Sequence, residues 1–85
     1  MAEPFYWRYE TSGALRPAVE AYLAGAELSA AQIAVLRNYL RQWIMAPVWR
    51  GDAVVALRES IELIETREAI DAWLAVAQGA GIDPL

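Results

Sequence analysis

The stretch SAAQIAVLRNYLRQWIMAP, residues 29–47, decides the fold that the sequence predicts. Ser29 followed by Gln32 forms a capping box, in which each side chain accepts a hydrogen bond from a free backbone N–H at the start of a helix. Pro47 disfavours further helix, so we expect a helix over residues 30–46. Apolar side chains cover about half of its circumference; they are Ile33, Val35, Leu36, Tyr39, Leu40, Trp43 and Ile44. A face this wide contacts two neighbours, which predicts a central helix.

Two further helices are predicted on either side of this one. Pro17 is tolerated only in the first turn of a helix, and Gly25 is suited to end one, which predicts a helix over residues 15–24. After the Pro47 stop, Asp52 is expected to be the N-cap of a helix over residues 52–65.

The chain beyond residue 65 is predicted to start a separate helix. Two apolar stripes occur in this region, one at Val54, Leu57, Ile61 and Ile64 and the other at Ile70, Trp73, Leu74 and Ala77. In one straight helix these stripes would point in nearly opposite directions. A break at Thr66, whose hydroxyl can cap a new helix, removes the conflict and predicts a helix over residues 67–78. Gly79 and Gly81 then end it and leave a short tail over residues 79–85.

The first 13 residues contain a dense aromatic run, FYWRY, at positions 5–9. Phe5, Trp7 and Tyr9 alternate with polar neighbours, a period that fits an extended arm with one apolar side. We expect the arm to cover the core of its own chain, and the alternative is that it docks on a second chain through Trp7 and Arg8. The sequence thus predicts one all-α domain over residues 1–85: a small bundle of about four short helices with an extended aromatic N-terminal arm.

The composition argues against several classes of function. The 85 residues include no cysteine and no histidine, the residues that most often bind transition metals, and histidine is the commonest general base. No glycine-rich phosphate loop opens a helix, so we expect no cofactor, no metal and no enzymatic activity. No apolar run reaches the length of a membrane span, and the N-terminus lacks the pattern of a secretion signal. We therefore expect a soluble, cytoplasmic protein with no membrane partner.

Charge is unevenly distributed along the chain. Residues 1–36 carry a net charge of −2, residues 37–58 of +3 and residues 59–85 of −5, which sum to −4. The basic middle combines arginine with aromatic residues, a mixture typical of protein interfaces and of single-stranded nucleic acid binding. Its candidate binding residues are Arg37, Arg41, Trp49 and Arg50. In the alternative interpretation Trp49 plugs the loop and the arginines pair with the acidic helices.

The acidic C-terminal third places carboxylates at three-residue steps, at Glu59, Glu62, Glu65, Glu68 and Asp71. Such a run is typical of the solvated face of amphipathic helices. The alternative is an array presented to a basic protein. Arg58 with Glu62 and Arg67 with Asp71 have the spacing for ion pairs within a helix, which would dilute the array.

Together these patterns predict a small non-enzymatic domain that binds another protein, as an adaptor, a regulatory subunit or an inhibitor. A phage or other mobile element is a conceivable source for such a protein. One alternative is a nucleic-acid-associated protein that uses the Arg- and Trp-rich middle. Another is a homodimer whose acidic and basic faces pair between subunits.

Overall fold

The computed structural model describes residues 13–82 and residue 84, and it is an all-α bundle. Four α-helices and one short 3₁₀ turn make up the described part of the chain. They are α1 (Leu15–Leu23), α2 (Ala30–Ile44), α3 (Asp52–Ser60), the 3₁₀ turn η2 (Ile61–Leu63) and α4 (Arg67–Gly79). None of the described helices has the length and apolarity needed to cross a membrane.

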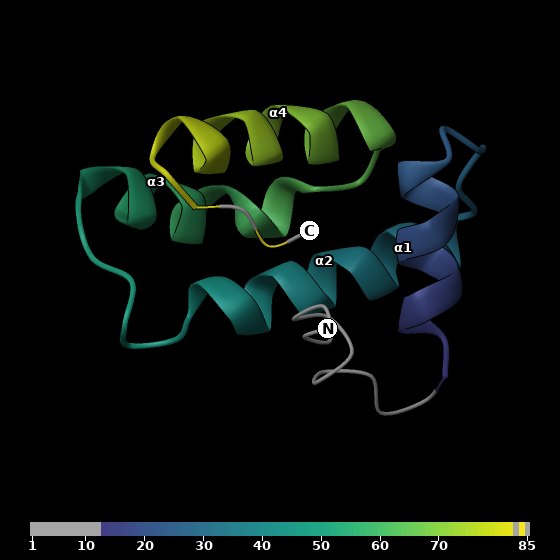
Figure 1. Ribbon diagram of the computed structural model, residues 1–85, viewed down its shortest axis with the longest axis horizontal. Coiled ribbons are helices and arrows are strands. Elements are labelled where there is room, and N and C mark those ends of the chain that lie inside the picture. Colours follow the sequence, from purple (N-terminus) through teal and green to yellow (C-terminus); the bar gives the residue numbers. More distant parts are fainter. Residues whose placement is uncertain (1–12, 83, 85) are drawn as a thin grey trace, which may run out of the picture.

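Helix α2 is central, as predicted. It packs against α1 on one side and against α3 and η2 on the other, while α3 also packs against α4. Figure 1 shows α2 across the middle of the molecule, α1 crossing one of its ends, and α3 and α4 side by side along one flank of α2. This arrangement leaves one side of the α3–α4 pair without a helix against it among the described elements.

Of the three predicted N-caps, two are confirmed and one is wrong, although α3 begins at Asp52 as predicted. Ser29 Oγ accepts from the Gln32 N–H at 3.1 Å, and the Gln32 side chain accepts from the Ser29 N–H at 3.0 Å. Thr66 accepts from the Ala69 N–H at 3.1 Å, which caps α4. Asp52 is not the N-cap of α3: Gly51 takes that position at a φ of 116°, and Asp52 is the first helical residue. A carboxylate is favourable there because the first turn carries the positive end of the helix dipole.

Glycines with positive φ end α1 and α4. Gly25 (φ 74°) donates to the Tyr22 carbonyl at 3.1 Å, and the Ala26 N–H donates to the Ala21 carbonyl at 2.9 Å. This pair of bonds is a Schellman motif, which requires a left-handed residue that glycine adopts without steric strain. Gly81 (φ 80°) ends α4 in the same way.

The predicted helix over residues 52–65 is shorter than expected. α3 ends at Ser60, η2 follows, and Ile64 is extended with a ψ of 109°. Side chains three residues apart eclipse one another in a 3₁₀ turn, and here Ile61 and Ile64 are both fully buried. The break therefore keeps the two isoleucines in the core while the chain reverses into α4.

In the described part of the chain, seventeen buried apolar residues form one core cluster. They are Leu15, Ala18, Val19, Leu36, Tyr39, Leu40, Trp43, Ile44, Val54, Leu57, Ile61, Ile64, Ile70, Trp73, Leu74, Ala77 and Ile82. Tyr39, on helix α2, is the member of the cluster that carries a hydroxyl group. Its Oη donates to the Pro84 carbonyl at 2.6 Å. Ile82 and Pro84 are buried, so the tail contributes two buried side chains, whereas residues 79–81 are exposed.

Candidate functional site

The two arginines predicted to bind a partner from α2 are both hydrogen-bonded inside the chain. Arg37 donates to the Ile64 carbonyl at 2.7 Å, at the point where the chain leaves η2. Arg41 donates to both carboxylate oxygens of Glu62, at 2.5 and 2.9 Å, and to the Asn38 side chain at 3.1 Å. The hydrogen bonds from Arg41 hold the pKa of Glu62 below its usual value. Both arginines thus join α2 to the η2 segment.

Trp49 and Arg50, predicted in the same surface, differ in their surroundings. The Trp49 ring lies 4.6 Å from the Trp43 ring between centroids, at an interplanar angle of 37°, and its Nε1 donates to the Trp43 carbonyl at 2.9 Å. These contacts make Trp49 a plug for the α2–α3 connection. Arg50 is exposed and makes no hydrogen bond or ion pair with other described residues. Trp7 and Arg8, with the aromatic arm, lie outside the described residues.

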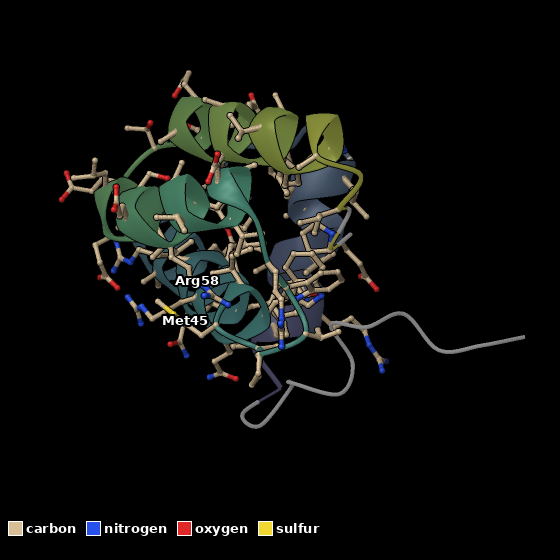
Figure 2. The ribbon with its side chains drawn as sticks, turned by 90° about the vertical axis from the view of Figure 1, so that its left-hand side faces the viewer. Met45 and Arg58 are labelled. Atoms are coloured by element: carbon tan, nitrogen blue, oxygen red, sulfur yellow. The ribbon has the colours of Figure 1, made fainter. Side chains whose placement is uncertain are left out.

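Arg58 ties α3 to the end of α2. Its guanidinium donates to the carbonyls of Ile44 at 2.9 Å, Ala46 at 3.2 Å and Trp49 at 3.3 Å. Figure 2 shows Arg58 beside Met45 at this end of the molecule. A positive charge is favourable there because the last carbonyls of a helix carry partial negative charge and have no partners within the helix.

Arg67 makes the equivalent connection from α4 to the end of α1. Its guanidinium donates to the carbonyls of Tyr22 at 3.3 Å, Ala21 at 3.5 Å and Ala26, and it lies 4.8 Å from the centre of the Tyr22 ring. The Tyr22 hydroxyl in turn donates to the Asp71 carboxylate. Burial, followed by the bond to Asp71, raises the pKa of Tyr22 to about 12.

The pairs Arg58–Glu62 and Arg67–Asp71, which have the spacing for ion pairs within a helix, do not form ion pairs in the structure. Arg58 and Arg67 turn toward carbonyl groups of other helices, so they do not neutralise Glu62 and Asp71. Three further carboxylates are exposed and make no ion pair or hydrogen bond with the described residues: Glu59, Glu65 and Glu68. Glu59, Glu65 and Glu68 are therefore without local charge compensation among the described residues, whereas Glu62 is paired with Arg41.

An apolar hollow lies between α3 and α4, and we call it the α3–α4 groove. Its volume is about 350 Å³. It is lined by Ala56, Leu57, Ser60, Leu63, Ile64, Ala69, Ala72, Trp73 and Val76. Two of these side chains are largely in solvent, Leu63 at 76 % exposure and Val76 at 50 %. Groups of this kind mark interaction sites more often than isolated exposed apolar residues do.

The polar side-chain atoms of the groove lining are already used within the chain. The Ser60 hydroxyl donates to the Leu57 carbonyl at 3.3 Å, and the Trp73 Nε1 donates to the same oxygen at 3.0 Å. Small-molecule sites usually contain a few convergent polar groups that orient the ligand. The groove is therefore better suited to apolar side chains than to a small polar ligand.

Sequence reasoning did not identify this groove. Leu63 and Val76 fall outside both predicted apolar stripes, and the alanines that line the groove were not assigned a role. The sequence did contain one indication of the groove: Leu63 and Val76 are large apolar residues on the polar sides of the predicted helices.

Exposed apolar side chains also occur elsewhere in the described part of the chain, among them Met45 (49 %) at the end of α2 and Val55 (51 %) on α3. Leu23 (60 %) is the last residue of α1, and Val48 (72 %) lies in the α2–α3 connection. Scattered exposed residues of this kind are normal on protein surfaces. They provide matched controls for substitutions in the groove.

The described residues contain no cluster of three or more acidic side chains arranged to hold a metal ion. Comparison of the chain with protein-family models, curated proteins and solved structures finds no match. The function therefore has to be inferred from the surfaces of the molecule itself.

Proposed function

We propose that this chain is a non-enzymatic domain that binds another protein through the α3–α4 groove, and that it acts as an adaptor, a regulatory subunit or an inhibitor. The observation that carries the proposal is the groove itself, an apolar hollow of about 350 Å³ with Leu63 and Val76 standing in solvent at its edge. Burying such side chains against a partner contributes roughly 25 cal/mol per Å² of apolar surface removed from water.

The arginine contacts favour this surface over the basic middle of the chain. Arg37, Arg41, Arg58 and Arg67 all donate hydrogen bonds inside the molecule, and each would have to leave its partner to bind another molecule. Of the residues first expected to bind, Arg50 keeps a free guanidinium within the described part of the chain. A face built for phosphate groups thus has less support than the groove.

Affinity capture from the native host with matched variants tests this proposal. Leu63→Ser removes the most exposed apolar side chain of the groove, and Leu23→Ser makes the same change at a similarly exposed position on α1. Both variants are expected to remain folded by circular dichroism, because neither leucine belongs to the core cluster. We expect the unmodified chain and the Leu23→Ser variant to capture the same partner protein. The Leu63→Ser variant is expected not to capture it. Equal capture by both variants would contradict the use of the groove.

A further inference from the structure

We infer that the partner presents a positively charged amphipathic α-helix to the α3–α4 groove. This inference rests on the proposed function and specifies the chemistry of what the groove binds.

The shape of the groove fits a third helix. The side chains of Ala56 and Ser60 on α3, and of Ala69 and Ala72 on α4, are all small and line the hollow. Small residues allow another helix to approach closely, within the 8 to 10 Å between axes that is usual for packed helices. A cavity of roughly 150 Å³ holds a benzene molecule, so about 350 Å³ has room for about two large side chains. A helix supplies such side chains from positions i, i+3 or i+4, and i+7.

The charge around the groove selects a basic helix. Glu59 lies three residues after the lining residue Ala56 on α3, and Glu68 lies four residues before the lining residue Ala72 on α4. Residues three or four apart are neighbours on a helix surface, so both carboxylates border the groove lining. Glu65 directly follows the lining residue Ile64. These carboxylates are exposed and without ion pairs among the described residues, while the nearby guanidiniums of Arg58 and Arg67 point toward other helices. Complementary charge at the rim speeds association and disfavours partners of the same sign.

The same charges argue against occupants from this chain. In a twofold dimer through the groove, the rim of one copy would face the identical acidic rim of the other, which is repulsive. Residues 1–12 carry two glutamates and one arginine, a net side-chain charge of −1, so the N-terminal arm is not complementary to the rim either.

Two synthetic helical peptides test the inference directly. Both carry leucine at positions i, i+3, i+4 and i+7; one has lysine at the flanking positions and the other has glutamate there. The unmodified full-length protein is titrated with each peptide and followed by nitrogen–proton NMR correlation spectra. We expect the lysine peptide to shift the amide signals of Ala56, Ala69 and Ala72 and to bind at least about tenfold more tightly than its glutamate twin.

Matched charge reversals separate the rim from the overall charge of the protein. Glu65→Lys with Glu68→Lys changes the rim, and Glu20→Lys with Glu27→Lys makes the same change in net charge at exposed positions on α1 and in the α1–α2 connection. The rim variant should lose about tenfold in affinity for the lysine peptide, and the control variant should change by less than about threefold. Both variants are checked for folding by circular dichroism.

Four results would overturn the inference. The first two are equal binding of the two peptides and equal effects of the two double variants on peptide affinity. The third is a dimer in sedimentation that Leu63→Ser abolishes. The fourth is a set of nuclear Overhauser contacts between residues 1–12 and the Val76 methyl groups in the free chain. The last two would assign the groove to a second copy and to the arm. If the peptides fail to discriminate but capture from lysate still depends on Leu63, the proposed function stands and the partner is of another kind. If capture does not depend on Leu63, the proposed function itself fails.

Discussion

The indole Nε1 of Trp73 in α4 donates a 3.0 Å hydrogen bond to the Leu57 carbonyl in α3. Both residues are buried, and both line the α3–α4 groove. The bond links the two helices at the floor of the groove and satisfies a donor that would otherwise be buried without a partner. The groove is therefore part of the folded chain before any partner binds, so less ordering is required on association.

Trp73→Phe is expected to lower the free energy of unfolding by about 1 to 2 kcal/mol, through loss of the hydrogen bond and of part of the ring contact. Urea denaturation measures the change. Trp49→Phe is the matched control, because it removes a comparable bond to the Trp43 carbonyl at a half-buried position. A loss at Trp73 no larger than the loss at Trp49 would show that the bond adds little to the α3–α4 contact.

Thr66→Ala should destabilise the domain by about 1 kcal/mol, because the Ala69 N–H loses its acceptor at the start of α4. Thr66→Ser keeps the hydroxyl and should retain most of the stability. The midpoint of chemical denaturation compares the three proteins. If the alanine and serine variants unfold at the same midpoint, the cap does not contribute as described.

The local signals for helix boundaries were largely sufficient to predict the fold. The Ser29–Gln32 box and the Thr66 cap each involve residues three apart in sequence, so their geometry follows from the chain itself. The N-cap of α3 was predicted one residue too late, at Asp52, because Gly51, which has a positive φ, could also serve as the N-cap.

Contacts between distant segments were not predictable in the same way. Arg58 and Arg67 have carboxylates four residues away, yet they donate to carbonyl groups of α2 and α1. Every residue carries a carbonyl, so the sequence contains no mark of which one will accept such a bond. The groove escaped prediction for a related reason: Ala69 and Ala72 acquire a role only when α3 lies beside α4.

Arg58→Lys should lower the free energy of unfolding by about 1 to 2 kcal/mol, although it keeps the charge. A lysine ammonium lacks the planar fork with which Arg58 reaches the carbonyls of Ile44, Ala46 and Trp49. Arg50→Lys, at an exposed position, should change stability by less than about 0.5 kcal/mol. Thermal and urea unfolding of the two variants provide the comparison. If Arg58→Lys is as stable as the unmodified protein, a positive charge at the end of α2 is sufficient for stability and the three hydrogen bonds add little.

We expect the free energy of unfolding to fall at alkaline pH because of the ionisation of Tyr22. Burial and the bond to Asp71 raise the pKa of Tyr22 to about 12 in the folded chain, above its ordinary value of 10.0. The folded state therefore favours the neutral phenol, and its contribution is complete below pH 10.0 and is lost as the pH rises toward about 12. Tyr22→Phe should remove this part of the pH dependence. Urea denaturation between about pH 8 and pH 12 tests it, and identical slopes for the two proteins would argue against the raised pKa.

Site-specific photo-crosslinking in the native host tests the binding role of the α3–α4 groove most directly. A photoreactive amino acid replaces Leu63 at the groove in one variant and Leu23 on α1 in the other, two leucines that are both exposed and outside the core. The account predicts that the Leu63 variant forms a covalent adduct with a different protein, and that the Leu23 variant does not. No adduct at Leu63, the same adduct from both positions, or an adduct of twice the mass of this chain would contradict it.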